Sequence, residues 1–457
     1  MALLLVDERA SRASVFTALL FMFLAGCGDP PRPPSFILVS LDTTRADHVG
    51  VYGYERDTTP FLDELAQRAF VFDRAIASSH NTLVSHASLV TGLSPLAHGA
   101  TPHEGGRAIA PAFATLGEDL TAAGYRTAAF LAHADWLSAR FGFDQGFGAF
   151  TSKYRSADRV LRQAERWLSR QSLESPYFLF LHLYDVHSDW GERPYDAPEP
   201  FRGRFATGDI DVKGMRGSDF LGEVNRGNID ITPAEVALLR DRYDEGLAYV
   251  DHRLSVFFDS LASETLERTW ILVVADHGEE FLEHGKLLHG TLHDEIVRVP
   301  LLVVPPLEGD DLPQTPVRVA EQVRLIDVLP TVLSLARLPS PADIEGVDLV
   351  PCMRNADACS SHPATLNDRG LRFEGFKLFR HEAGTSLYDL ERDPGEQTDL
   401  SSRPEMQERM AALNTLLGDL VSRQEAMRER ILQGEASPAV EMDPEAQERL
   451  KALGYVQ

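Results

Sequence analysis

The chain has 457 residues, of which 44% are hydrophobic and 25% are charged, as in ordinary globular proteins. This composition excludes a disordered, collagen-like or coiled-coil protein, and the length suits one large domain plus a smaller one, or two to three domains. The 44 Lys and Arg against 69 Asp and Glu give a net charge of −25, which repels nucleic acid and anionic membrane surfaces. An anionic substrate therefore needs a local positive site, such as a metal ion or a helix N-terminus.

The N-terminal segment has the features of an export signal. Arg9 and Arg12 precede an apolar run at residues 13–26, which ends in Leu24-Ala25-Gly26-Cys27. The run is too short to span a hydrocarbon core of about 30 Å comfortably. It resembles a bacterial lipoprotein signal peptide, which implies cleavage after residue 26 and a stable lipid anchor on Cys27. An uncleaved anchor or a buried helix is the alternative.

Residues 27–34 follow as a proline-rich tether, which holds the remaining chain away from the membrane. Gly28 stands where lipoproteins retained in the inner membrane commonly have Asp, so an outer-membrane location is favoured, facing the periplasm or the cell surface. Export implies an oxidising compartment, in which Cys352 and Cys359 can form a disulfide. Two unpaired thiols are the alternative.

Apolar runs alternate with amphipathic stretches between residues 35 and 365. This order predicts an α/β domain with a mainly parallel central sheet and helices on both faces. We expect strands at 36–41, 127–132, 177–182, 269–275 and 301–304. We expect helices at 60–69, 116–123, 157–169, 233–260 and 326–336.

Residues 366–433 predict a smaller α+β subdomain. Two β-like pieces at 373–380 and 386–390 precede the turn residues Asp393-Pro394-Gly395. A long helix follows, whose apolar residues recur in steps of four and three: Met406, Met410, Leu413, Leu417 and Leu420. Residues 434–457 form an acidic tail with a short amphipathic end.

Acidic residues follow two of the predicted strands. Asp42 comes directly after the strand at 36–41, and Asp276-His277 follows the strand at 269–275. Functional groups collect beyond the carboxyl ends of strands in open parallel sheets, so these side chains can form a divalent-metal site. A neutral His suits Mn, Zn or Fe better than Ca. The alternative is that each Asp forms a helix cap or a turn.

A hydroxyl at the start of a predicted helix is the third candidate. Thr82 opens the segment TLVSHASLVTG at residues 82–92, where free backbone N–H groups favour an anion. Metal coordination lowers the pKa of such a hydroxyl and makes it a usable nucleophile. The alternative is that Thr82 only caps the helix.

Five short segments, in this order along the chain, carry a family resemblance. They are LDTTRADH at 41–48, TLVSHASLVTG at 82–92, FLFLHLYDVH at 178–187, VADHGEEFLEHGKLLHGTLHDEIVRVP at 274–300, and the LYDL and DPGE pieces between 387 and 396. Through these segments the chain resembles the sulfatase family of the alkaline phosphatase superfamily over nearly all of its mature length. The resemblance implies a catalytic domain at 35–365.

The resemblance also implies site residues and a cofactor. One divalent ion, Mn, Zn or Ca, is expected on Asp42, Asp276 and His277, with Thr82 bridging metal and substrate. His187 and His289 are implied as catalytic contacts to the ester oxygens or the leaving group, and Arg45 and His86 as substrate contacts. Arg45 can instead pair with a carboxylate, and each His can instead be an ordinary hydrogen-bonded core residue. His289 stands where many sulfatases have a Lys.

The nucleophile segment departs from the family pattern. Many sulfatases have Cys-x-Pro-x-Arg, or a Ser version, whose first residue becomes formylglycine, whereas this chain reads Thr82-Leu83-Val84-Ser85-His86. Formylglycine is therefore not expected, and Thr82 would form an ester intermediate that water hydrolyses. The absence of a formylglycine residue therefore favours a phosphate ester over a sulfate ester as the substrate.

Three functions remain open on this basis. The first is a metal-dependent hydrolase of a sulfuric or phosphoric ester, with an anionic ester from a glycan or another envelope component as its partner. The second is a phosphotransferase that moves a phospho-alcohol headgroup onto an envelope glycan. The third is a noncatalytic envelope-binding lipoprotein. The intact acidic residues and the hydroxyl at position 82 argue against the third, because decay would first damage such costly buried charges.

Overall fold

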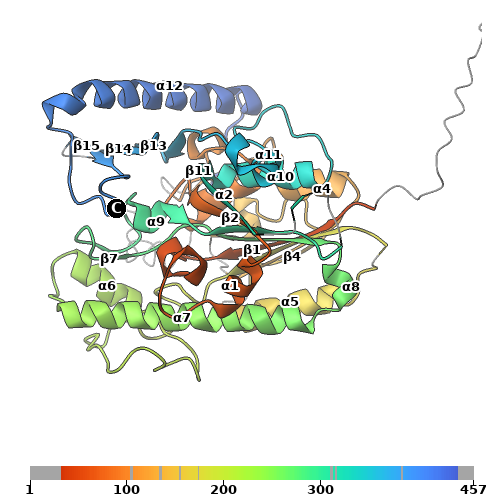
Figure 1. Cartoon of the computed structure of the whole chain (residues 1–457), viewed down its shortest axis with the longest axis horizontal. Helices are drawn as coiled ribbons and strands as arrows, with labels where there is room; N and C mark the ends of the chain where they lie inside the picture. Colours follow the sequence, from red (N-terminus) through yellow and green to blue (C-terminus); the bar gives the residue numbers. More distant parts are fainter. Residues whose placement is uncertain are drawn as a thin grey trace, which may run out of the picture. The chain divides into compact units, whose positions relative to one another are not determined.

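A mixed, mostly parallel sheet forms the centre of the fold (Figure 1). The computed structural model describes residues 32–440, apart from residues 103–105, 133–135, 154–155, 173, 309–311, 314–315 and 382–383. The predicted signal peptide, Cys27 and the end of the acidic tail lie outside the described residues. Residues from Pro33 onward belong to one structural unit.

The strand order of the central sheet is β11-β2-β10-β6-β1-β5-β3-β4, with β9 beside β2. The strand β10 is antiparallel to β6 and β2, and β9 is antiparallel to β2, whereas the other pairings are parallel. The strands are β1 (Ser35–Leu41), β2 (Phe70–Ile76), β3 (Arg126–Leu131), β4 (Ala149–Thr151), β5 (Tyr177–Leu183), β6 (Thr269–Ala275), β9 (Arg298–Val299), β10 (Leu301–Val304) and β11 (Val317–Arg324).

Helices cover both faces of this sheet because successive strand residues point to opposite sides. Apolar residues at even positions of β1 and β5 face the core under α2, α4 and α10, and those at odd positions face α1, α5 and α7. The helices are α1 (Pro60–Ala66), α2 (Thr82–Thr91), α3 (Pro95–His98), α4 (Leu116–Ala122), α5 (Ala157–Leu168), α6 (Gly217–Asn225), α7 (Pro233–Ser260), α8 (Ser263–Leu266), α9 (Asp294–Val297), α10 (Val328–Leu335) and α11 (Val350–Arg354).

A second, antiparallel sheet follows the large domain. Its order is β12-β13-β14-β15, and the long helix α12 (Gln407–Leu432) packs on it through Leu413 and Leu417. The strands are β12 (Ala364–Leu366), β13 (Gly370–Phe373), β14 (Phe376–His381) and β15 (Gly384–Asp389). The short strands β7 (Glu280–Phe281) and β8 (Leu287–Leu288) pair with each other and form a separate two-stranded sheet.

The predicted fold class is confirmed, with local differences. The stretch at 373–380, predicted as one β piece, is a hairpin, because Glu374 and Gly375 turn the chain with φ of 49° and 75°. The strands β2 and β11 were not predicted. In β2, Asp73 and Arg74 interrupt the apolar run, so the segment shows neither a continuous apolar stretch nor a regular alternation of apolar and polar residues. No helix among the described residues is long and apolar enough to cross a membrane.

Candidate active site

Three neighbouring parallel strands bring the acidic residues together. In the order β6-β1-β5, Leu41 pairs with Ala275 on one side and with Leu183 on the other. Asp42 and Asp276 each come directly after these paired ends, so both carboxylates leave the sheet at the same edge. Both residues are fully buried, as is His277.

Thr82 reaches this edge from the helix α2. The side chain of Asn81 accepts a hydrogen bond from Val84 N at 3.3 Å and thereby caps the helix start. Thr82 Oγ1 lies 3.3 Å from His277 Nε2. Since the cap belongs to Asn81, the hydroxyl of Thr82 is available for chemistry.

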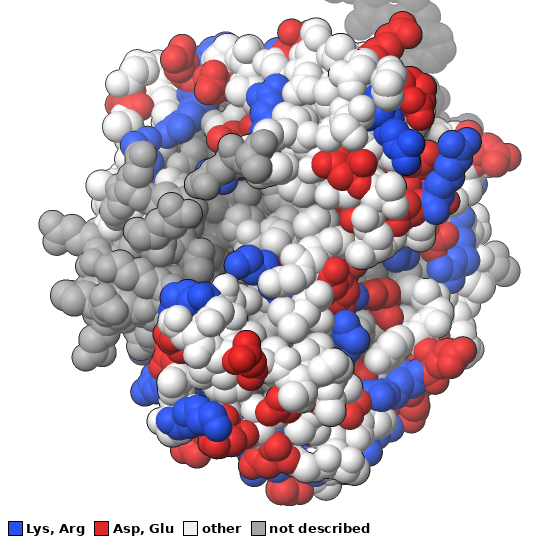
Figure 2. Space-filling view, turned by 90° about the vertical axis from the view of Figure 1, so that its left-hand side faces the viewer, with Lys and Arg blue, Asp and Glu red and all other residues white. Residues whose placement is uncertain are grey.

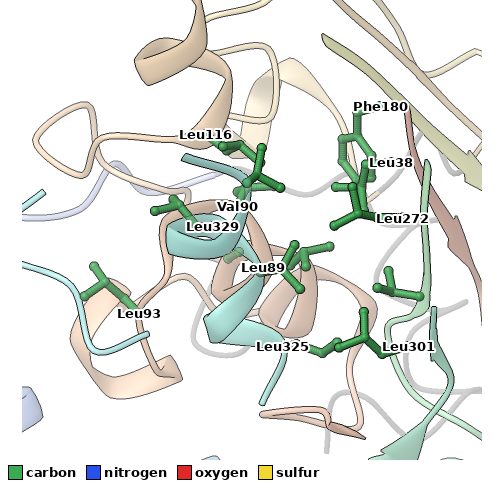
Figure 3. Close-up of a cluster of buried hydrophobic side chains, with 14 of the residues drawn as sticks. Leu38, Leu89, Val90, Leu93, Leu116, Phe180, Leu272, Leu301, Leu325 and Leu329 are labelled. Atoms are coloured by element: carbon green, nitrogen blue, oxygen red, sulfur yellow. The ribbon is translucent and has the colours of Figure 1, made fainter. Parts of the chain in front are cut away.

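The helix α2 is held rigidly because all of its residues are buried. Leu89 points toward the side of the sheet residues Leu38 and Leu272, whereas Val90 lies beside Leu116 of α4 and Leu329 of α10 (Figure 3). A helix that is buried all round has little freedom to shift, so the position of Thr82 is fixed by the core.

The carboxylates offer unused oxygens to a metal ion. Asp42, Asp276 and His277 each place a ligand atom within 4.8 Å of the others. Asp42 Oδ1 and Asp276 Oδ2 are buried without a hydrogen-bond partner among the described residues. Buried charges of this kind are paired or bind metals, so the residues fit a divalent cation.

The electrostatics of the pair support the same reading. Burial and the neighbouring Asp276 raise the pKa of Asp42 to about 7. Burial also acts to raise the pKa of Asp276, but His277, His86 and His182 outweigh it and hold that pKa below its ordinary value. Two carboxylates this close repel each other, and a cation between them removes that repulsion.

His182 is a site residue that the sequence interpretation missed. Its Nε2 lies 2.9 Å from Asp42 Oδ2, and burial lowers the pKa of His182 to about 4, so it is neutral and donates this bond. The signal was present in the sequence: His182 comes two residues after Phe180 in β5 and therefore points to the face that carries α2.

His86 is a residue of α2 itself, and its ring is held by contacts within the protein. Its Nδ1 donates to the carbonyl of Thr82 at 2.8 Å, and its Nε2 is 2.9 Å from Ser40 Oγ. The same Nδ1 is 3.5 Å from Asp276 Oδ2. Since His86 is fully buried, it supports Thr82 and Asp276 from behind.

Arg45 is engaged by carboxylates and a backbone carbonyl of the protein. Its Nε donates to Asp47 at 2.8 Å, and its NH1 group donates to the carbonyl of Glu279 at 3.0 Å and to Glu283 at 2.8 Å. A guanidinium that is 4% exposed and bound in this way ties two loops together. The structure therefore favours the ion-pair alternative over contact with substrate.

Two further histidines stand beside the acidic pair, and each is oriented by a carboxylate. His187 Nδ1 is 2.9 Å from Asp189 Oδ1, and His289 Nδ1 is 3.0 Å from Glu279 Oε1. The ring of His289 lies 4.5 Å from that of His277 and 5.2 Å from that of His187, centroid to centroid. The sequence interpretation did not single out Glu279, although it directly follows the Asp276-His277-Gly278 run.

The environments of these two histidines push their pKa values apart. Burial acts to lower the pKa of His187, but Asp189 outweighs it and raises the value. Burial and the charge of His187 hold the pKa of His289 well below its ordinary value. Burial raises the pKa of Glu279 to about 8. A pair of groups with opposed shifts is typical of an acid and a base at one site.

The loop that carries Asp42 is held by a tyrosine. Thr43 has φ of 51°, an outlier for a β-branched residue. The hydroxyl of Tyr243, on α7, donates to the carbonyl of Thr43 at 2.7 Å and accepts from Arg45 N at 2.8 Å. Thr43 N in turn donates to Asp276 Oδ1 at 3.3 Å. The strained turn thus links both carboxylate loops to α7.

Two of the three cysteines lie elsewhere in the structure. Cys352 and Cys359 are joined as a disulfide at α11 and do not contribute to the site. Cys27 lies outside the described residues.

A buried cluster of acidic and histidine side chains, beyond the carboxyl ends of parallel strands, is typical of an α/β enzyme site. The family model "Sulfatase" matches residues 34–338, which is more than half of the chain. The model "N-sulphoglucosamine sulphohydrolase, C-terminal" matches residues 282–423. The chain therefore belongs to the sulfatase family, as its motifs predicted, and it is a hydrolase of that family.

Individual relatives cover most of the chain at low identity. An arylsulfatase of Clostridium perfringens is 23% identical over 84% of this chain and 93% of its own length. A Delta 4,5-hexuronate-2-O-sulfatase of Bacteroides thetaiotaomicron is 23% identical over 88% and 92%, respectively. Family members typically use a divalent metal, in keeping with the unused oxygens of Asp42 and Asp276.

Solved structures share the fold. A 2-O GAG sulfatase superposes with a TM-score of 0.66 at 19% identity, covering 91% of this chain and 100% of that one. The phosphonate monoester hydrolase of Agrobacterium radiobacter gives a TM-score of 0.66 at 20% identity, covering 86% and 96%. The two functions differ, so the fold does not distinguish sulfur from phosphorus esters.

Proposed function

We propose that this protein hydrolyses a sulfate ester with Thr82 as an unmodified nucleophile. The observation that carries the proposal is the position of Thr82 Oγ1, 3.3 Å from Nε2 of His277, a residue that shares its ligand cluster with Asp42 and Asp276. The relatives named above as sulfatases favour sulfate over phosphate as the group that is cleaved.

Asp42, Asp276, His277 and Thr82 would hold one divalent ion, of which Zn or Mn suits the imidazole and carboxylate donors better than Ca. When bound, such an ion neutralises the anionic ester and lowers the pKa of the Thr82 hydroxyl. The backbone N–H groups at the start of α2 add a partial positive charge at the same place. Attraction of the anion therefore comes from the site itself.

The reaction balances without formylglycine. Thr82 Oγ forms a bond to sulfur as the bond from sulfur to the leaving oxygen breaks, and the Thr82 proton ends on the released alcohol. Water then attacks the Thr82 sulfate ester, which returns the hydroxyl and releases hydrogen sulfate. Each step needs one group that donates a proton and one that accepts it.

His187 and His289 are placed to exchange these protons. His187, held by Asp189, has a raised pKa and suits the donation of a proton to the leaving oxygen. His289, held by Glu279, has a lowered pKa and suits the acceptance of a proton from water. The carboxylates fix the two rings, so that proton transfer needs no search for orientation.

A sulfated glycan is the substrate class that we favour. The relative named Delta 4,5-hexuronate-2-O-sulfatase acts on a sulfated uronate by its name. On the face shown in Figure 2, acidic and basic side chains are interspersed, without a broad basic patch. Recognition of a polyanion by long-range attraction is thus not expected, and turnover should fall only weakly with added salt.

We also propose that the protein acts as a lipoprotein anchored through Cys27, with the outer membrane favoured. The lipobox at residues 24–27 and the proline-rich tether support this proposal. Cells are grown with a labelled fatty acid. Incorporation of the label into the wild-type protein, and its loss in Cys27→Ser, would support the proposal, whereas an unprocessed N-terminus would contradict it.

Thr82→Ala tests the nucleophile, with Thr82→Ser as the matched control. The proposal expects Thr82→Ala to fold and to lose turnover of an aryl sulfate by several orders of magnitude, while Thr82→Ser retains a measurable part. Aryl phosphate monoester and diester are assayed beside the sulfate, and the Thr82 peptide is analysed by mass spectrometry after rapid quenching.

The outcomes of these assays distinguish sulfate-ester from phosphate-ester chemistry. A sulfated Thr82 peptide supports the proposal, and unchanged turnover in Thr82→Ala overturns it. A phosphorylated Thr82 with turnover of phosphate esters alone would favour phosphoryl chemistry, including the transfer of a phospho-alcohol group to a glycan. A residue at position 82 with the mass of an oxidised side chain would contradict the unmodified nucleophile.

A further inference from the structure

A second cluster of ligand-type side chains lies outside the candidate active site. Glu280 of β7, His284 of the following loop and His293 at the start of α9 place ligand atoms within 4.8 Å of one another. Glu295 joins them, since its Oε2 lies 3.4 Å from His284 Nε2. We call these four residues the second cluster.

The second cluster and the active site lie on opposite sides of the extended segment that contains Glu279 and Glu280. Glu279 binds His289 in the active site, whereas its neighbour Glu280 faces His293, with Oε1 3.3 Å from Nδ1. Consecutive residues of an extended chain point to opposite sides. The adjacent residues Glu279 and Glu280 therefore belong to two different sites, the active site and the second cluster.

The carboxylates of the second cluster have contacts to the imidazoles at 3.3 and 3.4 Å but no hydrogen bond among the described residues. Glu280 is 0% exposed, and neither of its oxygens has a hydrogen-bond partner among the described residues. Glu295 Oε2 and His284 Nε2 are buried without hydrogen-bond partners as well. A buried carboxylate in this condition is strongly destabilising unless a cation joins it.

The nearby cationic side chains are already engaged. Lys377 binds Glu396 at 2.9 Å and Asp294 at 2.5 Å, and Arg372 binds Asp294 at 3.0 Å. Burial acts to lower the pKa of His284, but Glu295 outweighs it and raises the value, so a metal ion would replace a proton there. With both imidazoles deprotonated for metal binding, the second cluster carries two negative charges. A single divalent cation would balance them.

We propose that Glu280, His284, His293 and Glu295 bind a second divalent metal ion of the zinc class, distinct from the ion of the active site. Two imidazole nitrogens and two carboxylate oxygens form a donor set that suits Zn²⁺ and related transition metals better than Ca²⁺ or Mg²⁺. The two imidazole rings stack with centroids 3.4 Å apart, so ligation by both rings needs one of them to tilt out of the stack.

The ion would connect the catalytic domain to the C-terminal sheet. The ring of His293 contacts those of Phe379 and Tyr388, on β14 and β15, with centroids 5.3 and 6.1 Å away. Fixing His293 to Glu280 and His284 would thus hold the C-terminal sheet against the β7–α9 segment. The role is structural, and no step of the reaction passes through it.

The test counts metal ions in variants of the full chain. Purified protein is first stripped of metal and then dialysed against buffer that contains Zn²⁺ at about one equivalent per site, and bound metal is measured by mass spectrometry. We expect about two ions per chain in the wild type and about one in Glu280→Gln, because a neutral amide is a poor zinc ligand. Glu264→Gln, an exposed Glu on α8, is the control that keeps both ions.

Asp276→Asn removes a ligand of the active-site ion and leaves the second cluster intact, so it isolates metal binding by the second cluster. This variant should retain about one ion, and Zn²⁺ should raise its melting temperature, because an ion bound only to the folded state stabilises it. The double variant Asp276→Asn with Glu280→Gln should bind none and show no such rise. Glu295→Gln, at the more exposed edge of the cluster, replaces Glu280→Gln if the latter does not fold.

Two results would overturn the proposal. One is an Asp276→Asn variant that binds no ion and gains no stability from Zn²⁺. The other is a Glu280→Gln variant that keeps the wild-type metal content and is more stable than the wild type, since this is expected if Glu280 is merely an unpaired buried carboxylate. Neither result depends on whether Thr82 is the nucleophile.

Discussion

Removing the hydroxyl of Tyr243 tests whether the strained turn after β1 positions the active site. Tyr243→Phe deletes a donor to the carbonyl of Thr43 and an acceptor for the N–H of Arg45, at 2.7 and 2.8 Å. Both backbone groups are buried and would be left without partners. The aromatic ring and its packing against Phe281 are kept.

The magnitude follows from the two lost bonds. An unsatisfied buried polar group costs about 1–3 kcal/mol, so the two groups left by Tyr243→Phe should lower the free energy of unfolding by roughly 2–6 kcal/mol. The φ of 51° at Thr43 is then no longer enforced, and the turn can relax. Because Asp42 is the preceding residue and Thr43 N binds Asp276, we expect metal affinity to fall about 10–100-fold.

Tyr52→Phe is the matched control. The hydroxyl of Tyr52 also makes two backbone hydrogen bonds, donating to Leu301 O at 3.2 Å and accepting from Leu301 N at 2.9 Å. These bonds hold the start of β10 and no residue of the site. Urea unfolding, metal titration and aryl sulfate turnover are measured for both variants.

Both variants should lose stability, and Tyr243→Phe alone should lose metal affinity and turnover. If Tyr243→Phe is destabilised but binds metal and turns over as the wild type does, the turn does not position the site. If Tyr243→Phe is as stable as the wild type, water or a backbone shift has replaced the lost bonds and the magnitude above is wrong.

Three further predictions concern the metal, its support and a buried carboxylate. Removing divalent metal with a chelator should abolish turnover and lower the melting temperature, because Asp42 and Asp276 then repel each other without compensation, and Zn²⁺ or Mn²⁺ should restore both. His182→Phe should weaken metal binding about 10–100-fold in a direct titration, since Asp42 Oδ2 loses its donor at 2.9 Å; unchanged affinity would mean that the ion alone orients Asp42. Asp251 of α7 accepts hydrogen bonds from Phe61 N and Leu62 N at the start of α1, and burial raises its pKa from 3.8 to about 7. Between these two values the folded state holds a proton that the unfolded state has released, so stability should fall as pH rises, by about 1.4 kcal/mol per pH unit at most. Asp251→Asn should remove that slope in urea unfolding measured at a series of pH values, and an unchanged slope would exclude Asp251 as its origin.

Local patterns were sufficient for the main elements of the fold. The buried runs of β1, β5 and β6 are continuously apolar, as parallel strands covered on both faces must be, and α7 starts at Pro233 after the capping Thr232. The strand β2 could not be found in this way. Its Asp73 and Arg74 lie in the middle of the strand, where Asp73 pairs with Arg318 of β11, a contact that exists only once the sheet is assembled.

The sequence by itself singled out the candidate metal ligands and the candidate nucleophile, because Asp42 and Asp276-His277 follow recognisable strand ends and Thr82 stands at a helix start. Only the tertiary structure decided what surrounds them. His182 became a partner of Asp42 because β5 lies beside β1 in register, and Arg45 became an ion-pair residue because the β7 segment folds over it. Strand order and loop packing depend on the burial of surfaces far apart in the chain, and this non-local free energy leaves no periodic signal in any one segment.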